Sequence, residues 1–386
     1  MCYTFHMPKV KTSKIDRLIE KIGLKYFLRL SSKIKSEKAI KLSHIPSDRV
    51  LQVVSQNITI NAVIIAFLVG ALTTVPAVLF ELYYHNSYTP TYYYLILSSI
   101  TLLLLVIEVS ILYWLGIRSV YTLSSLTDYE DEQEHKLPME YDVKKMMVRS
   151  ALELEDPAVE YLGIDPQKYV SKQWLILRAM LYKAKIALTS FILRFVLRKV
   201  AMRYGVRVSF IWIAIPVTAI WDAIVMHRVI VDAKLRLFGY HLSRYISEEL
   251  ITDRVLESYS PSVKEGCIRA ISTVMVLSRN YHPNSILLLI RLNQNLAIKE
   301  GKDYDNLEVF LDYIDKATPR ERHLLRSLAG VSAVFDAKLN RDEKEALKKI
   351  FGDEEKRYMA FTKRLKSLLL SGRIHESALV CEGMVE

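Results

Sequence analysis

Two long apolar segments dominate the pattern of hydrophobic and polar positions along the chain. Residues 58–82 and 92–116 are each 25 residues long and contain no lysine or arginine. A helix of about 25 residues spans about 37 Å, which exceeds the hydrocarbon core of a bilayer, about 30 Å thick. The pattern therefore predicts a transmembrane helical hairpin over residues 58–116, with a kink expected at Pro76 in its first helix.

The nine residues between these segments, 83–91, are predicted to form the turn of the hairpin. They include Asn86, Ser87 and Pro90, and tyrosines gather at both ends of the turn, as is typical of a headgroup interface. Residues 1–57 are rich in lysine and arginine, whereas the turn contains neither. By the positive-inside rule, both ends of the hairpin and the N-terminus are expected in the cytoplasm.

Two polar segments flank the hairpin. In the basic segment 1–57, apolar residues recur at spacings of three and four over 14–43, which predicts an amphipathic helix. This helix either lies on a membrane surface or packs on the rest of the protein. The segment 117–173 is net acidic and is predicted to be a cytosolic connector. Its densest acidic run, 128–135, is interpreted as a solvated face, with docking of a basic partner as the alternative.

The segment 174–245 is predicted to be a second, basic helical hairpin. Residues 174–202 are helical in character but carry several basic residues, whereas 208–226 are a better membrane span. Both halves could cross, only the second could cross, or the hairpin could dip into the cytoplasmic leaflet. Two of these three arrangements keep the C-terminus in the cytoplasm, where we expect it. The basic side chains expected to contact anionic lipid headgroups are Arg194, Arg198, Lys199, Arg203 and Arg207.

Residues 246–386 have the pattern of a soluble, all-helical domain. Proline and glycine separate the predicted helices 267–277, 285–296, 306–317, 320–335, 341–351 and 353–371. The fold class predicted for the whole chain is therefore all-α, with a membrane-embedded part and a cytosolic helical domain. We further expect residues 247–372 to fold alone as a monomer, because each helix has one apolar face to bury.

Composition and charge exclude several classes of function. The 386 residues carry a formal charge of +11, but the basic blocks flank apolar segments, which favours anionic lipid over nucleic acid as the partner. The three cysteines show no CxxC or Cys/His spacing, so neither a disulfide framework nor a zinc site is expected. The chain contains no GxGxxG, P-loop, HExxH or GxSxG motif, so we expect neither an enzyme nor a bound cofactor.

Three acidic residues lie in or beside the apolar segments: Glu81, Glu108 and Asp222. An unpaired charge at the middle of a bilayer costs about 2.5 to 3.5 kcal/mol, so such residues normally have a partner. Glu81 lies next to the tyrosines, whereas Glu108 is deep in its helix and should be paired. For Asp222 the nearest basic residue across the second hairpin is Lys185. This pair either pins two helices together or belongs to a proton or ion pathway.

Two stretches are similar to known families. Residues 161–236, with the GIDP turn and the motif RYGVR, resemble the central region of an uncharacterised family of bacterial multi-spanning membrane proteins. The stretch VSAVFDAKLNRDEKEALKKIF resembles the helical repeat of the tellurite-resistance TerB-like domains, in which an Asp-Gly loop precedes an acid that opens the next helix. That resemblance implies a metal site at Asp336, Asp342 and Glu343, although Ala337 stands in place of the glycine. Alternatively, Asp342 and Glu343 are first-turn acids favoured by the helix dipole.

These observations favour a non-catalytic integral membrane protein of the bacterial inner membrane. It would present a TerB-like domain to the cytoplasm as an accessory subunit or scaffold, together with a protein partner or further copies of itself. The alternative is an oligomeric ion channel or transporter that uses Glu108 and Asp222.

Overall fold

The fold is described from a computed structural model and is all-α, as predicted. Two three-residue strands, β1 (Lys9–Lys11) and β2 (Ala158–Glu160), pair antiparallel and are the only strands among the described residues. The structure describes residues 9–11, 14–31, 45–84, 87–127, 142–154, 156, 158–164, 207–278, 282–296, 298, 303–335, 339 and 341–385.

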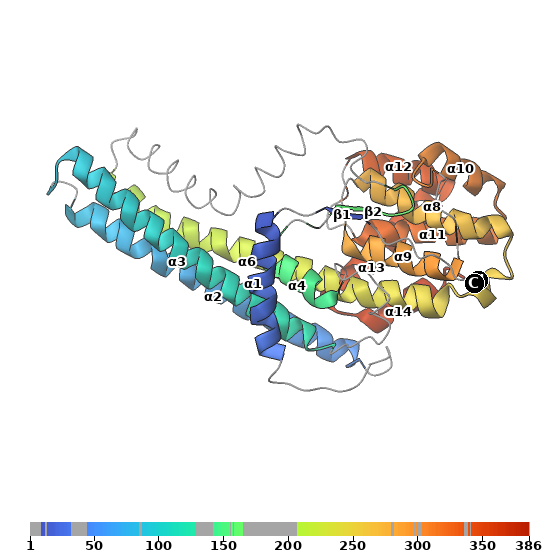
Figure 1. Cartoon of the computed structure of the whole chain (residues 1–386), viewed down its shortest axis with the longest axis horizontal. Helices are drawn as coiled ribbons and strands as arrows, with labels where there is room; N and C mark the ends of the chain where they lie inside the picture. The colour runs from blue at the N-terminus through green and yellow to red at the C-terminus, as the bar shows by residue number, and fades with distance from the viewer. Residues whose placement is uncertain are drawn as a thin grey trace.

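Three long helices form an extended bundle that projects from a group of shorter helices (Figure 1). They are α2 (Asp48–Tyr84), α3 (Pro90–Ser124) and α6 (Arg207–Tyr245), of 37, 35 and 39 residues. Each is long and apolar enough to cross a membrane. The predicted hairpin 58–116 is thus confirmed as α2 and α3, and both helices continue beyond the predicted spans.

The shorter helices form a compact domain at one end of the bundle. Helices α8, α9 and α11 each begin with a proline, which is favoured at the first position because its missing N–H has no partner there. The helices predicted between 267 and 371 correspond to α8 to α13. The domain consists of η4 (Ile246–Leu250), α7 (Asp253–Leu256), α8 (Pro261–Ser278), α9 (Pro283–Leu296), α10 (Leu307–Lys316), α11 (Pro319–Phe335), α12 (Arg341–Phe351), η5 (Gly352–Glu354), α13 (Glu355–Ser371) and α14 (Ile374–Glu382).

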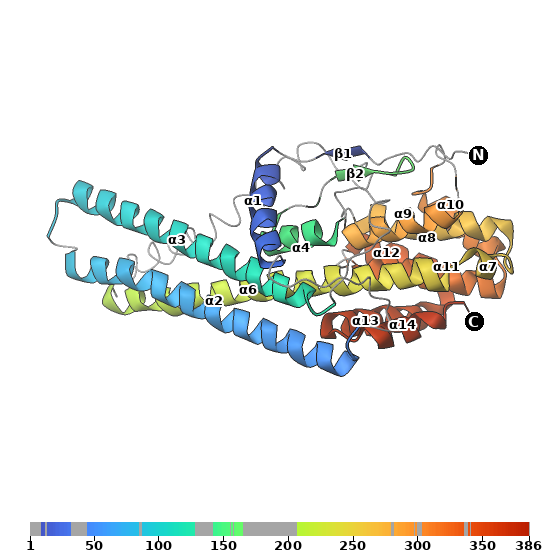
Figure 2. The ribbon, with the colours of Figure 1, turned by 60° about the horizontal axis from the view of Figure 1, so that its bottom comes forward.

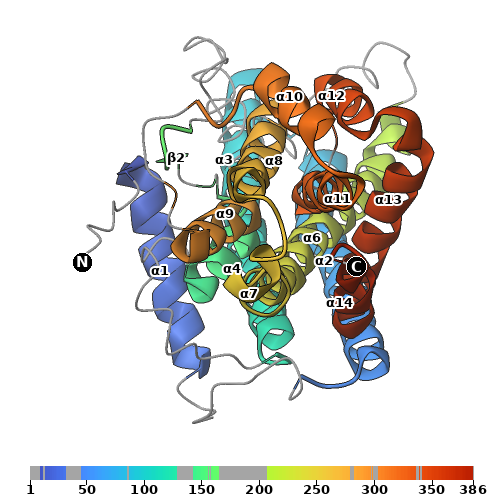
Figure 3. The same ribbon diagram turned by 90° about the vertical axis from the view of Figure 1, so that its right-hand side faces the viewer.

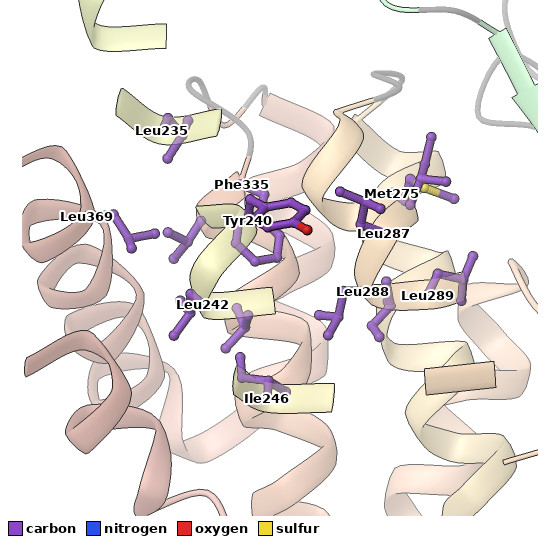
Figure 4. Packing of buried hydrophobic residues seen from close by; sticks show 14 of the residues in the cluster. Leu235, Tyr240, Leu242, Ile246, Met275, Leu287, Leu288, Leu289, Phe335 and Leu369 are labelled. Carbon is purple, nitrogen blue, oxygen red and sulfur yellow. The ribbon is translucent and has the colours of Figure 1, made fainter. Parts of the chain in front are cut away.

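Helix α6 belongs to both parts of the molecule. Its apolar stretch was expected to end at Met226, but the helix continues to Tyr245 and enters the core of the domain. Phe238 and Tyr240 are fully buried there. Figure 4 shows side chains of α6 packed among those of α8, α9, α11 and α13, including Leu235, Tyr240, Leu242, Met275, Leu287, Phe335 and Leu369.

The expected domain boundary between residues 245 and 246 therefore falls inside a packed core. That core also includes Ile374 and Cys381 of α14, which lie beyond the fragment 247–372. Figure 3, viewed from the domain end, shows α13 and α14 alongside α6 and α2. The fragment lacks two elements that bury its apolar faces, which argues against its folding alone.

Helix α1 (Lys14–Ser31) crosses the bundle where the bundle meets the domain (Figure 2). Its Phe27 ring packs edge-on against Tyr121 of α3, with 5.3 Å between ring centroids. Its Glu20 forms a buried ion pair of 2.7 Å with Arg149 of α4 (Val143–Ala151). The predicted amphipathic helix thus packs on the rest of the protein, and residues 32–43 lie outside the described residues.

Candidate functional site

The deep acid of the hairpin, Glu108, has a partner on the facing helix. The Thr73 hydroxyl donates a hydrogen bond to Glu108 Oε2 over 2.8 Å, and the Glu108 residue is 0% exposed. The same Thr73 oxygen lies 2.9 Å from the carbonyl oxygen of Val69 in its own helix. In hydrocarbon such a contact satisfies polar groups that lipid cannot satisfy, so it joins α2 to α3 inside the apolar layer.

The second buried acid, Asp222 of α6, lies against a glycine of α2. Asp222 is 2% exposed, and a Cβ atom added to Gly70 would lie 2.5 Å from Asp222 Oδ2. The same Cβ would lie 3.0 Å from the carbonyl oxygen of Thr218. Only a residue without a side chain allows α2 and α6 to approach this closely, which is a common packing device between membrane helices.

Glu108 and Asp222 lie at the same level along the bundle. Helices α3 and α6 run in the same direction, and a Cβ on Gly116 of α3 would lie 3.9 Å from Val229 of α6. Glu108 precedes Gly116 by eight residues and Asp222 precedes Val229 by seven, which are nearly equal axial distances at about 1.5 Å per residue. Both acids therefore surround one turn of α2, and we call Gly70, Thr73, Thr74, Glu108 and Asp222 the polar cluster.

The spacing of small residues along α2 predicts its close packing against a neighbouring helix, whereas the pattern of charges does not. Small residues recur every four positions along α2, and all of them are buried. Such small-xxx-small spacing places one narrow stripe on a helix face, which allows a neighbouring helix to approach. The stripe consists of Ala62, Ala66, Gly70 and Thr74.

Several predicted site residues lie outside the described residues. Lys185, Arg194, Arg198, Lys199 and Arg203 fall between residues 165 and 206, and only the backbone is described for Arg207, the first residue of α6. The ion pair of Asp222 with Lys185 and the headgroup contacts of the basic hairpin therefore stay predictions.

The residues predicted to hold a metal are only partly described. Asp342 is exposed and Glu343 is 0% exposed, so the two side chains face different surroundings in the first turn of α12. Asp336 lies outside the described residues. Among the residues that the structure describes, no group of three His, Cys, Asp or Glu side chains could hold a metal ion. The position of Asp342 and Glu343 in a first turn is that of dipole-stabilising acids.

A buried ion pair connects α6 to the segment that precedes it in the chain, through Asp156. Arg236 of α6 binds Asp156 through two bonds, Nη1 to Oδ1 over 2.6 Å and Nη2 to Oδ2 over 2.9 Å. Its Nε donates to Asp232 Oδ2 over 2.7 Å. This geometry satisfies the planar guanidinium on two sides, which fixes the rotation of α6 where it enters the domain.

A second joint connects the start of α2 to the end of the domain. The Asp48 carboxylate accepts hydrogen bonds of 3.0 Å each from the backbone N–H groups of His375 and Glu376, at the N-terminus of α14. The His375 ring nitrogen Nδ1 lies 2.8 Å from the same carboxylate. An acidic side chain at a helix N-terminus is favoured by the helix dipole, so Asp48 caps α14 from another helix.

Comparisons of the chain with protein-family models, with curated proteins and with solved structures gave no match.

Proposed function

We propose that this is a non-catalytic membrane protein that holds a TerB-like helical domain in a fixed orientation, as an accessory subunit or scaffold of a membrane assembly. Continuity of α6 carries the proposal. A helix of 39 residues is about 58 Å long, so α6 can cross a bilayer and still contribute its last turns to the domain core. The contact of Asp48 with the N-terminus of α14 attaches the domain to α2 as well, and Arg236 attaches α6 to the segment that contains Asp156.

The domain is proposed to lie in the cytoplasm, on the same side as the N-terminal segment. Tyr161 lies shortly before the gap in the described residues at 165–206, and its hydroxyl accepts a hydrogen bond from Asn293 in the domain. Arg207, where the chain returns, lies level with the far end of α2, because Gly70 faces Ala219 and the two helices run antiparallel. Asp48 at the start of α2 and Tyr245 at the end of α6 both contact α14 of the domain, so these two helix ends lie at the same end of the bundle. The positive-inside rule then supports a cytoplasmic domain in a bacterial inner membrane.

The outer face of α3 supports assembly with a further membrane helix. Of an apolar stretch of 18 residues in α3, only 11% is buried within the chain. Leu102, Leu103 and Val106 are 63%, 62% and 58% exposed. This face contacts either lipid or another helix in the membrane, and in the proposed role it carries the partner or a second copy.

Two measurements test the proposal: the oligomeric state of the protein in a mild detergent, and crosslinking of single cysteines in the native membrane. A cysteine at Val106 should crosslink to a partner or to a second copy, whereas a cysteine at Leu72 on α2, which is 69% exposed, should not. Recovery of the full-length protein as a lone monomer, with no crosslink from Val106, would contradict the role.

A channel or transporter is the second candidate, and the polar cluster favours it. Glu108 and Asp222 are buried at one level beside the same turn of α2, and buried acids within a membrane are typical of ion or proton pathways. Flux through proteoliposomes that contain the purified chain tests this function. Flux that requires both carboxylates should fall in Glu108→Gln and in Asp222→Asn, and flux unchanged in both variants would contradict it.

A further inference from the structure

A pocket of about 810 Å³ opens where α2, α6 and α13 meet, at the domain end of the bundle. Figure 3 shows these three helices next to one another. We call it the lysine pocket, because Lys234 of α6 and Lys363 and Lys366 of α13 line it. Its volume is within the usual range for ligand sites, about 300 to 1,000 Å³.

The charge of the lysine pocket fits an anion. None of its described lining residues is acidic, and His227 adds a further basic group. Lys234 is 5% exposed, and no ion pair joins its ammonium group to a carboxylate of the described residues. A buried ammonium group without a counter-charge is costly, so an anion in the pocket would stabilise the folded protein.

The wall of the lysine pocket that α2 forms is apolar at Ile60, Val63 and Ile64 and polar at Gln56 and Thr59. Ile60 and Ile64 line it and are 55% and 53% exposed. The same face of α2 continues at spacing four with Leu68 and Leu72, which are 50% and 69% exposed. The apolar wall is therefore the end of a stripe that runs along the span, and a soluble anion gives no reason for it.

The lysine pocket also lies at the depth of lipid headgroups. Ile60 is close to the start of the apolar stretch of α2 at residue 58. The other end of that stretch is marked by exposed tyrosines, with Tyr83 75% and Tyr92 67% exposed. With one interface at the tyrosines, the other lies roughly 30 Å away along the helix, at the level of Ile60 and the three lysines.

We propose that the lysine pocket binds one anionic glycerophospholipid, with its phosphate on Lys234, Lys363 and Lys366 and an acyl chain along Ile60 and Ile64. The site is distinct from the headgroup contacts expected of residues 194–207. It does not depend on the scaffold role, since only the position of the bundle in the membrane enters the argument.

Lipid binding to the delipidated full-length protein tests the site. Native mass spectrometry is used with dioleoyl phosphatidylglycerol, with dioleoyl phosphatidylcholine and with inorganic phosphate. We expect one phosphatidylglycerol per chain, bound at least tenfold more tightly than phosphatidylcholine. The double variant Lys363→Gln/Lys366→Gln, whose side chains are exposed and half-buried, should bind it about thirtyfold more weakly, which corresponds to about 1 kcal/mol per lysine.

The matched control is Lys344→Gln/Lys349→Gln, which removes two exposed lysines of α12 and should leave binding within twofold of the unmodified chain. Equal loss in the control and the pocket variant would overturn the site in favour of general charge attraction. Binding unaffected by the pocket variant, or equally tight phosphatidylcholine, would also overturn it. Inorganic phosphate that competes fully with phosphatidylglycerol would show a soluble-anion site instead.

Discussion

Thr73 of α2 and Glu108 of α3 are joined by a hydrogen bond of 2.8 Å, although 35 residues separate them in the chain. The contact lies between two helices whose buried residues are otherwise mostly apolar or small. It gives the hairpin one fixed register, because a shift of either helix along its axis would separate the hydroxyl from the carboxylate.

Thr73→Val should destabilise the bundle by about 1 kcal/mol, the usual scale of a hydrogen bond between membrane helices. The change keeps the shape of the side chain and removes the hydroxyl that meets Glu108. Unfolding in mixed micelles measures the difference. Thr101→Val is the control, since the Thr101 hydroxyl bonds to the Leu97 carbonyl within α3. Equal stability of the two variants would show that the interhelical bond contributes nothing.

Gly70→Ala should destabilise the contact between α2 and α6 by about 1 to 3 kcal/mol, because overpacking forces the backbone to move. The added Cβ would meet Ala219 Cα at 3.0 Å as well as the Asp222 carboxylate. Gly383→Ala is the matched control, since its Cβ would meet nothing closer than 3.9 Å. The same unfolding measurement applies, and a neutral Gly70→Ala would mean that the two helices are not in close contact.

The fragment 228–385 should fold cooperatively, whereas 247–372 should not, because only the longer one contains the buried part of α6 and α14. Circular dichroism and limited proteolysis compare the two, and independent folding of 247–372 would restore the boundary at residue 246.

In the full chain, Phe238→Ala should lower the free energy of unfolding by about 3 to 5 kcal/mol, as deletion of a buried aromatic ring usually does. Trp212→Ala, at a residue 48% exposed, is the control.

The positions of the helices were predictable because their determinants are local. Apolar length identified α2 and α3, and prolines separated the predicted helices, although α8 begins at Pro261 rather than at the predicted Cys267. The continuation of α6 was not predictable, because His227 and Arg228 follow its apolar stretch and resemble the end of a span. Arg236, which lies beyond them, is buried and paired with Asp156, and a linear pattern does not contain that information.

Acid should destabilise the domain through Glu321, which closes a capping box at the start of α11. Its carboxylate accepts hydrogen bonds of 2.8 Å from the backbone N–H groups of Thr318 and Ser260. Burial raises the pKa of Glu321, but the bonds from Ser260 and Thr318 outweigh burial and lower the pKa to about 2, against 4.5 for a free side chain. Because the folded pKa is depressed, this stabilisation is present above about pH 4.5 and is lost as pH falls toward 2.

The stability difference between the unmodified chain and Glu321→Gln, measured by denaturant unfolding, should therefore shrink between pH 4.5 and pH 2. Glu345→Gln, at an exposed position of α12, is the control and should show no such convergence. A difference that stays constant over this range would show that ionised Glu321 does not stabilise the cap.

Chemistry at the candidate site was predictable in part. The need of Glu108 for a partner followed from the cost of a charge in lipid, but the identity of Thr73 on the facing helix as one such partner did not follow from the sequence. The lysine pocket was not predictable, since Lys234 and Lys366 are distant in sequence and become neighbours only when α13 packs on α6.

Labelling of single cysteines with a membrane-impermeant thiol reagent in intact cells tests most directly whether the bundle spans a membrane with the domain on one side. Native Cys2, Cys267 and Cys381 are first replaced, and single cysteines are placed at Tyr88, Glu132 and Lys344. The cysteine at Tyr88, in the turn of the hairpin, should react in intact cells. Those at Glu132 and Lys344 should react only after the membrane is permeabilised. Reaction of Glu132 or Lys344 in intact cells, or protection of Tyr88, would contradict the account.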